Sequence, residues 1–248
     1  MGAHTGFRLL AAVFVLVNTI RAHADCVDPA QIAHATVSIM RHFDEAERIA
    51  RPDLIGVRGT GWILSPTTIV TAAHVVEAMK LTDQDWKVLE IADENSNRFV
   101  AARIRRLAGD QMERLAVVEL QRAAFDISAA LQVRREPLGP DEQILTLVYA
   151  GGLPHVVRGR FARFGDGGKL AGTALLEIYE GDNRLIIDHG ASGAPVVDCD
   201  GRVAAVISDI FTLNLAFASR QIRVSTAWGT PNVVSVPIQV LEQLPERQ

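Results

Sequence analysis

The sequence contains only two cysteines, few aromatic residues and no excess of positive charge. Two cysteines in 248 residues exclude a dense disulfide scaffold and a cysteine-rich metal site. The formal net charge of −4 lacks the positive surplus that attracts nucleic acids or anionic membranes, so we expect no nucleic-acid partner. The one basic cluster, 103–106, surrounds Ile104 and is predicted to be the solvated face of a strand.

Metal-binding patterns and sequence repeats are also missing. The histidines His34, His42 and His155 show no paired spacing of the His-Glu-x-x-His type. We therefore expect neither a bound metal nor a cofactor. With no internal repeat and no low-complexity segment, the chain is predicted to be globular, and its 48% hydrophobic residues suffice to bury a full core.

The one long apolar run lies at the N-terminus, at residues 9–20. It follows the positive charge of Arg8 and precedes Ala22-His23-Ala24, which has the pattern of a signal-peptidase cleavage site. The run is shorter than the roughly 20 residues that span a bilayer. We therefore predict a cleaved signal peptide over residues 1–24, no membrane span, and a secreted or periplasmic protein.

Short strand-like runs dominate the rest of the chain. Each is rich in valine, isoleucine or aromatic residues and is bounded by glycine, proline, aspartate or asparagine. This pattern favours an all-β sandwich or barrel. The predicted runs are 36–40, 61–64, 68–71, 87–91, 99–105, 115–120, 143–149, 156–164, 174–179, 185–187, 194–197 and 202–208.

Two breaks in this pattern suggest how the chain is organised. Charged residues, two prolines and a glycine interrupt it at 132–141, which we predict to be a linker between residues 25–131 and residues 132–248. Near the end, Pro237 opens a segment with apolar residues at helical spacing through Leu244, which predicts a C-terminal helix.

The candidate nucleophile is Ser192, in the segment Gly190-Ala191-Ser192-Gly193-Ala194-Pro195. Glycines on both sides and a following proline predict a tight turn that exposes the serine hydroxyl. A hydroxyl needs a base to take its proton, so the interpretation requires a histidine elsewhere. His74, at the end of Thr71-Ala72-Ala73-His74, is the candidate base.

Together the two segments resemble the signatures of the trypsin-like, chymotrypsin-fold serine proteases, T-A-A-H and G-x-S-G-x-P. The histidine precedes the serine, as in this family and unlike the α/β-hydrolases. The segments 59–66, 152–154 and 200–203 further resemble the catalytic domain of HtrA-type proteases, and we expect no PDZ domain to follow. The resemblance implies two six-stranded antiparallel β-barrels with a C-terminal helix, one barrel carrying His74 and the other Ser192.

The same resemblance implies a serine endopeptidase whose partner is a polypeptide substrate; it implies no particular oligomeric state. His74 would act as general base, and the backbone N–H groups of Gly190 and Ser192 would form the oxyanion hole. Gly193 is expected to serve only the turn. Ile186, six residues before the serine, is the candidate base of the substrate pocket and would favour an apolar residue there, although an isoleucine in a strand core explains it equally well.

The third member of the triad breaks the family pattern. The family has an aspartate directly before an apolar strand that here is Leu115-Ala116-Val117-Val118, and Arg114 occupies that place. Three alternatives remain open: Glu113 reaches the histidine, Asp110 does, or no acid does. The missing aspartate keeps a second function open, a weakened or inactive trypsin-like domain that binds peptides or proteins. A purely structural β-protein is disfavoured because it needs neither motif.

The two cysteines, Cys26 and Cys199, form a disulfide or remain two unrelated thiols. Export permits a disulfide, because extracytoplasmic compartments are oxidising. We predict that they pair, which would tie the start of the mature chain to the second barrel.

Overall fold

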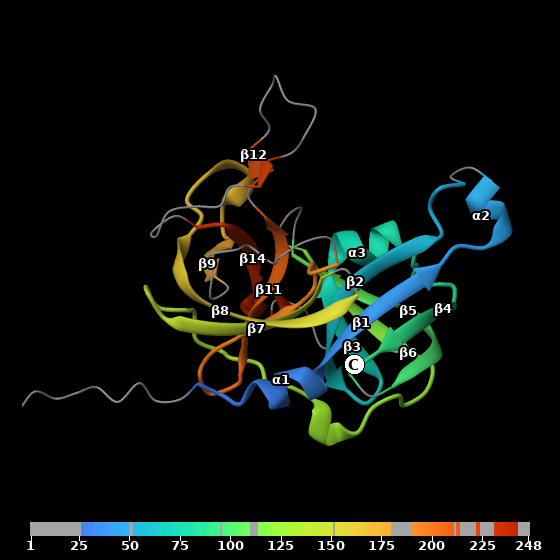
Figure 1. The fold of residues 1–248 in the computed structure, drawn as a ribbon, viewed down its shortest axis with the longest axis horizontal. Helices are drawn as coiled ribbons and strands as arrows, with labels where there is room; N and C mark the ends of the chain where they lie inside the picture. The colour runs from blue at the N-terminus through green and yellow to red at the C-terminus, as the bar shows by residue number, and fades with distance from the viewer. Residues whose placement is uncertain are drawn as a thin grey trace, which may run out of the picture.

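The computed structural model describes residues 26–49, 52–94, 96–109, 114–150, 152–179, 190–210, 212–213, 222–223 and 231–242. Its main strands form two closed six-stranded antiparallel barrels (Figure 1). The first barrel contains β1 (Thr36–His42), β2 (Gly56–Ser65), β3 (Thr68–Ala72), β4 (Lys87–Ala92), β5 (Asn97–Ala108) and β6 (Leu115–Leu120). The second contains β7 (Gln143–Ala150), β8 (Leu153–Phe164), β9 (Ala174–Tyr179), β10 (Pro195–Val197), β11 (Val203–Ile210) and β14 (Val233–Pro237).

The remaining elements are short. The helices are α1 (Pro29–Ala35), α2 (Glu45–Ile49), α3 (Ala73–Ala78) and the 3₁₀-helices η2 (Ile127–Ala129), η3 (Gly168–Leu170) and η4 (Ile238–Leu241). A two-stranded sheet pairs β12 (Thr212–Leu213) with β13 (Ile222–Arg223). The sequence pattern predicted neither α1 nor α2.

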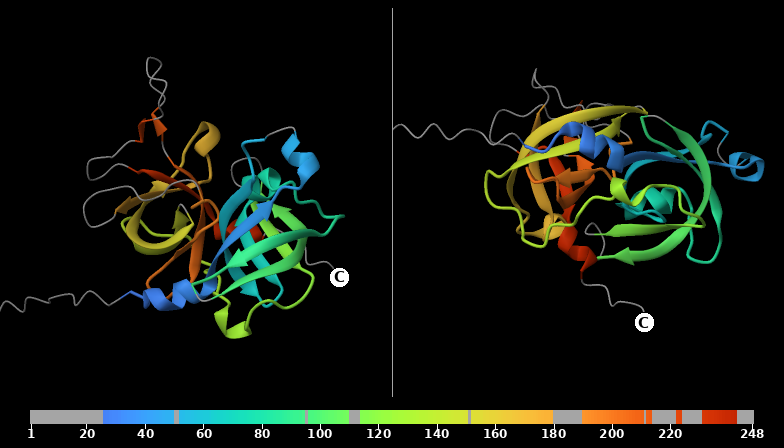
Figure 2. Two further views of the ribbon diagram at one scale, coloured as in Figure 1. Left: turned by 45° about the vertical axis from the view of Figure 1, so that its right-hand side comes forward. Right: turned by 90° about the horizontal axis from the view of Figure 1, so that it is seen from below.

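The two barrels pack side by side through a shared apolar cluster (Figure 2). β3 explains the arrangement, because all five of its residues are buried. Ile69 points into the core of the first barrel, while Val70 belongs to the cluster between the barrels. Because β3 is covered on both faces, its adjacent apolar residues Ile69 and Val70 are both fully buried. Other members of the shared cluster are Trp62, Leu115, Leu147, Val206 and Val236.

The predicted fold class is confirmed: the main strands form two six-stranded antiparallel β-barrels. The expected C-terminal helix is present as η4, a single 3₁₀ turn after Pro237 whose Ile238 and Val240 are buried. The helix ends at Leu241, earlier than predicted, and Glu242 is its C-cap; residues 243–244 and the predicted strand 185–187 lie outside the described residues. Among the described residues no helix is long and apolar enough to cross a membrane.

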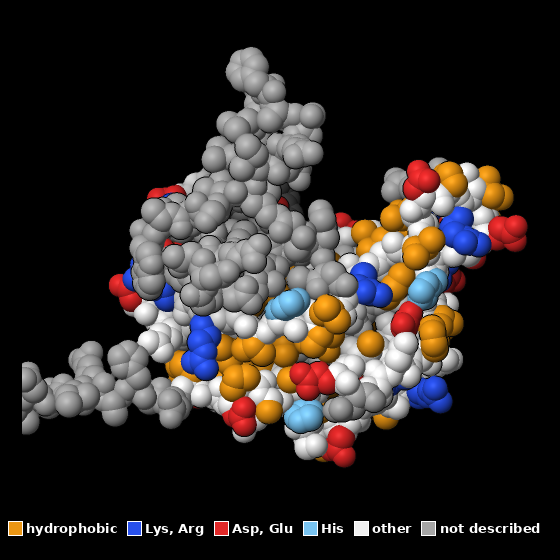
Figure 3. Space-filling view, in the orientation of Figure 1, with side chains coloured by type: hydrophobic (Ala, Val, Ile, Leu, Met, Phe, Trp, Pro, Cys, Tyr) orange, Lys and Arg blue, Asp and Glu red, His pale blue; other side chains and the backbone are white. Residues whose placement is uncertain are grey.

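Charged side chains of both signs are interspersed on the face drawn in Figure 3. The cluster 103–106 behaves as a strand face, as predicted. Arg103 pairs with Glu119 on the neighbouring strand at 2.9 Å and covers the ring of Trp86. These contacts occupy the Arg103 guanidinium within the first barrel. The absence of a nucleic-acid partner stays a prediction.

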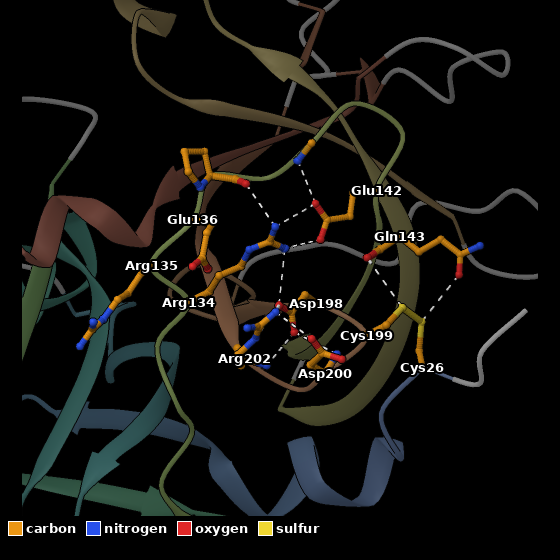
Figure 4. Close-up of polar contacts among 12 residues, drawn as sticks. Cys26, Arg134, Arg135, Glu136, Glu142, Gln143, Asp198, Cys199, Asp200 and Arg202 are labelled. Atoms are coloured by element: carbon orange, nitrogen blue, oxygen red, sulfur yellow. Dashed lines mark hydrogen bonds and ion pairs between the residues drawn. A yellow bond between two sulfur atoms is a disulfide. The ribbon is translucent and has the colours of Figure 1, made fainter.

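Cys26 and Cys199 form a disulfide, which confirms the predicted pairing (Figure 4). Next to it, the backbone N–H of Val27 donates to the carbonyl of Cys199 at 3.0 Å. The chain then enters α1, whose Ile32 and Ala33 are buried in the cluster shared by the barrels. The disulfide therefore fixes a segment that closes one end of the interface.

An ion-pair network beside the disulfide holds the predicted linker against the second barrel (Figure 4). Arg134 pairs with Glu142 and, at 3.5 Å, with the buried carboxylate of Asp198. That carboxylate also accepts hydrogen bonds from the backbone N–H groups of Asp200 and Arg202, at 3.0 and 2.9 Å. Asp198 thus organises the turn that leads from the serine segment into β11.

Candidate active site

His74 is the second residue of α3, directly after β3. The predicted strand 68–71 is part of β3, which leads directly into this helix. The backbone N–H of Ala73 donates to the carbonyl of Arg114 at 3.2 Å, and Ala72 lies opposite Leu115 in the β3–β6 ladder. The start of α3 is therefore held by the segment in which the family carries its acid.

Ser192 lies on the predicted turn, between β9 and β10 in the second barrel. Its hydroxyl donates a hydrogen bond to the carbonyl of Ser208 at 3.2 Å, and its own carbonyl accepts from the backbone N–H of Thr60 at 2.9 Å. Among the described residues no hydrogen bond joins Ser192 to His74. The hydroxyl is only half-buried, so a rotation about its side chain can release it from Ser208.

Thr60 of β2 joins the serine turn to the first barrel. Its hydroxyl donates to the carbonyl of Gly190 at 2.6 Å and accepts from the backbone N–H of Tyr149 at 3.1 Å. Gly190 has a φ of 105°, and a side chain there would approach the Tyr149 carbonyl to 2.5 Å. Glycine is therefore required by both the backbone conformation and the space.

Gly193 does more than serve the turn, which corrects the sequence prediction. Its φ is 94°, and an added Cβ would lie 2.0 Å from both the carbonyl oxygen of Thr60 and the hydroxyl oxygen of Thr71. Thr71 in turn donates to that same carbonyl at 2.6 Å. The missing side chain lets the serine turn approach β2 and β3, so Gly193 sets how closely the two barrels meet at this point.

The backbone N–H groups of the turn divide into two kinds. Those of Gly193 and Ala194 donate to the carbonyls of Ile207 and Ala191, at 2.8 and 3.1 Å. Those of Gly190, Ala191 and Ser192 donate to no acceptor in the part of the chain that the structure describes. Unpaired backbone donors are rare where the chain is packed, and several of them beside one serine hydroxyl form a potential anion-binding site.

The side chain of His74 is exposed to solvent, although the surrounding protein removes part of the hydration of its ring. Loss of hydration is the main influence on this group and lowers the pKa of His74 below its ordinary value. The negative charges of Asp209 and Glu77 act in the opposite direction and raise this pKa. The ring is therefore neutral near pH 7, which is the form that accepts a proton.

A comparison with protein families settles what kind of chain carries this arrangement. Residues 59–206 match the trypsin-like peptidase domain, a stretch that makes up more than half of the chain and includes both His74 and Ser192. The chain belongs to the trypsin-like peptidase family. No curated protein sequence matches it.

Solved structures support the same trypsin-like fold. The Rv3671c protease from M. tuberculosis in its active form has 15% sequence identity and a TM-score of 0.54, with 95% of this chain and 89% of that chain covered. The inactive form of the same protease has 16% identity and a TM-score of 0.53, with 86% and 89% covered. The Cys26–Cys199 disulfide is consistent with an extracytoplasmic location.

Arg114 occupies the family's aspartate position in the structure as it does in the sequence. Its side chain turns toward α3, where it pairs with Glu77 at 2.8 Å. An arginine there cannot hold the imidazole in the orientation that a trypsin-like triad uses. The two substitutes predicted from the sequence, Glu113 and Asp110, lie outside the described residues, as does the candidate pocket residue Ile186.

Two residues near the trypsin-like site were missed by the sequence reasoning. In the sequence Thr60 is one residue of the glycine-rich segment 59–66, and nothing in that segment indicates that its hydroxyl reaches Gly190. Asp209 follows the serine by many residues, and its place depends on how β11 pairs with β14. In both cases the decisive contact is between distant parts of the chain.

We expect Thr60→Val to destabilise the protein by about 2–4 kcal/mol. Valine has nearly the same shape but leaves the Gly190 carbonyl and the Tyr149 N–H without their partner, and each such loss costs about 1–3 kcal/mol. Urea denaturation of the purified protein measures the change. Thr60→Ser keeps the hydroxyl and is the matched control. Equal stability of the valine and serine variants would contradict the assigned role.

Proposed function

We propose that the protein is an exported serine endopeptidase that cleaves peptide bonds through an acyl-enzyme on Ser192, with His74 as general base. The observation that carries the proposal is that the N–H groups of Gly190 and Ser192, the two expected oxyanion-hole donors, have no acceptor among the described residues. These donors flank a serine hydroxyl on a turn that the first barrel holds in place through Thr60. Such preorganised donors stabilise the oxyanion of a tetrahedral intermediate.

In the proposed reaction the Ser192 hydroxyl breaks its hydrogen bond to the Ser208 carbonyl, and its oxygen attacks the carbonyl carbon of the scissile bond. His74 takes the hydroxyl proton as the new carbon–oxygen bond forms, and the N–H groups of Gly190 and Ser192 receive the oxyanion. The resulting imidazolium gives its proton to the departing amine as the peptide bond breaks. A water molecule, deprotonated by His74, then releases the acyl group as a carboxylic acid.

The proposal also includes export from the cytoplasm and a substrate preference. The predicted signal peptide at 1–24 and the Cys26–Cys199 disulfide support an oxidising compartment outside the cytoplasm. We propose that Ile186 forms an apolar base of the substrate pocket, which favours substrates with an aliphatic or aromatic residue before the cleaved bond. The partner is then an unfolded or flexible polypeptide.

We expect kcat/KM for peptide hydrolysis to rise with pH through the pKa of His74 and to reach its plateau before neutral pH. The neutral imidazole is the active base, and burial lowers its pKa below the ordinary value of 6.5. Hydrolysis of a fluorogenic peptide from about pH 4 to pH 9 measures the profile. Circular dichroism over the same range checks that the protein stays folded. An inflection above 6.5 would contradict the expectation.

A second function is favoured by one observation, the Arg114–Glu77 ion pair at the family's aspartate position. In that case the chain is a weakened or inactive trypsin-like domain that binds peptides or proteins at the same surface. In the Ser-His-Asp triad of trypsin-like proteases, loss of the orienting acid lowers kcat by about 10⁴-fold. The two functions therefore differ by a large factor in turnover.

A covalent probe separates the two. The purified mature protein is treated with a fluorophosphonate and analysed by intact mass and peptide mapping. An endopeptidase with an activated serine gains the probe's mass on Ser192, because the probe reacts with an activated serine and mimics the tetrahedral intermediate. A binding domain gains none while its folded signature by circular dichroism is unchanged.

A further inference from the structure

A β-bulge in β11 decides which way Asp209 points. In the β11–β14 ladder Ile207 lies opposite Ser235, whereas Asp209 lies opposite Val234, so Ser208 is one extra residue in β11. Ser208 is also the residue whose carbonyl accepts the Ser192 hydroxyl. The bulge is thus located directly beside the candidate nucleophile, where bulges commonly redirect a side chain.

Residues that pair across a sheet share a face, so the partners of β11 reveal its orientation. Ile207 points into the second barrel, where it joins the core with Val233. Val206 and its partner Val236 point the other way, into the cluster shared with the first barrel. Asp209 pairs with Val234, which lies two residues from Val236 and on the same face.

Without the extra residue, Asp209 would have the orientation of Ile207 and would point into the apolar core of the second barrel. A one-residue change of register reverses the face that a strand residue presents. The bulge therefore turns this carboxylate toward the first barrel, where it is exposed rather than buried. β11 lies against β3 across the interface, and His74 comes two residues after β3 ends.

Among the described residues, the other charged groups around His74 lie on α3 and on the elements packed against it. Glu77 is on the same helix and pairs with Arg114, and Arg58 of β2 lies against Gly152 and donates to the sulfur of Met40. The remaining charged residues on the packed elements lie at the far end of α3 or of β6; they are Arg41, Glu47, Lys80 and Glu119.

We propose that Asp209, delivered from the second barrel by the bulge at Ser208, is a negative charge that stabilises the His74 imidazolium in this chain. It takes over the electrostatic part of the role that the family assigns to an aspartate before β6. The inference rests on the proposed peptidase function for its catalytic meaning. Asp209 acts through His74 and is therefore a positioning residue.

The first test measures His74 directly and needs no activity. The His74 ring is titrated by NMR in a Ser192→Ala protein, which cannot digest itself, and its signal is identified by its loss in His74→Gln. Adding Asp209→Asn should move the His74 titration to lower pH, because the charge that raises the pKa of His74 is removed. Asp209→Glu should largely restore it. An unchanged midpoint in Asp209→Asn would overturn the proposal.

Asp85→Asn is the matched control, since Asp85 is an exposed aspartate whose carboxylate makes no hydrogen bond or ion pair among the described residues. It removes the same charge from another part of the first barrel. The His74 midpoint should stay where it is in the parent protein. A shift as large as that of Asp209→Asn would show a general charge effect and would also overturn the proposal.

The second test uses the active chain and a fluorogenic peptide. Asp209→Asn should lower the plateau of kcat/KM by about tenfold, the size expected from loss of one nearby charge, and should move the acidic limb to lower pH. A purely structural defect lowers the plateau without moving the limb. If the parent protein labels with fluorophosphonate and Asp209→Asn changes neither feature, the role of Asp209 is wrong and the peptidase stands. If the parent fails to label, the peptidase function is wrong, and the NMR titration alone decides whether Asp209 controls His74.

Discussion

Ser192→Ala is expected to reduce the kcat for peptide hydrolysis by at least about 10⁴-fold, because the acyl-enzyme cannot form without the hydroxyl oxygen. The fold should be nearly unaffected. The hydroxyl makes a single hydrogen bond, to the Ser208 carbonyl at 3.2 Å, and such a bond contributes about 1 kcal/mol. Hydrolysis of casein and of a fluorogenic peptide measures the loss, and thermal unfolding checks the stability.

Ser128→Ala is the matched control for this substitution, because Ser128 is an exposed serine at η2, outside the serine turn. It should retain the parent activity and fluorophosphonate labelling. Undiminished hydrolysis by Ser192→Ala would remove the proposed mechanism. Equally low hydrolysis by the parent and by Ser192→Ala would instead favour the peptide-binding domain.

The fold was predictable from the sequence because its two signatures depend on local chemistry. Gly190 and Gly193 both adopt positive φ, and the sequence around Ser192 predicts a tight turn for that reason. His74 follows the predicted strand 68–71, and the other predicted strand runs correspond to barrel strands, apart from 185–187, which lies outside the described residues. These features are read over a few neighbouring residues, so one sequence is enough to find them.

The details that adjust the site depend on contacts between distant segments. The hydroxyl of Thr60 bonds to Gly190, 130 residues further along the chain, and no pattern in β2 announces that contact. The orientation of Asp209 depends on one extra residue in the pairing of β11 with β14. The sequence alone therefore indicates Glu113 and Asp110 as replacement acids, because they are close in the chain to Arg114, where the family has its aspartate.

Removal of the disulfide is expected to have the largest effect on stability. Replacing both Cys26 and Cys199 by alanine should lower the free energy of unfolding by roughly 3–5 kcal/mol. The bond joins residues 173 positions apart, so it greatly restricts the unfolded chain. It also holds α1 at the barrel interface, where Ile32 is fully buried, so its loss lets this segment detach as well.

Urea denaturation of the parent protein, with and without a reductant, measures the same effect without a mutation. The reduced parent should unfold at the lower urea concentration of the double alanine variant, and the reductant should leave that variant unchanged. Each single alanine variant should match the double variant, because either substitution breaks the bond. If the oxidised and reduced parent unfold together, the disulfide contributes nothing to stability. Anchoring of α1 would then depend on its apolar packing and on the hydrogen bond from Val27 to Cys199.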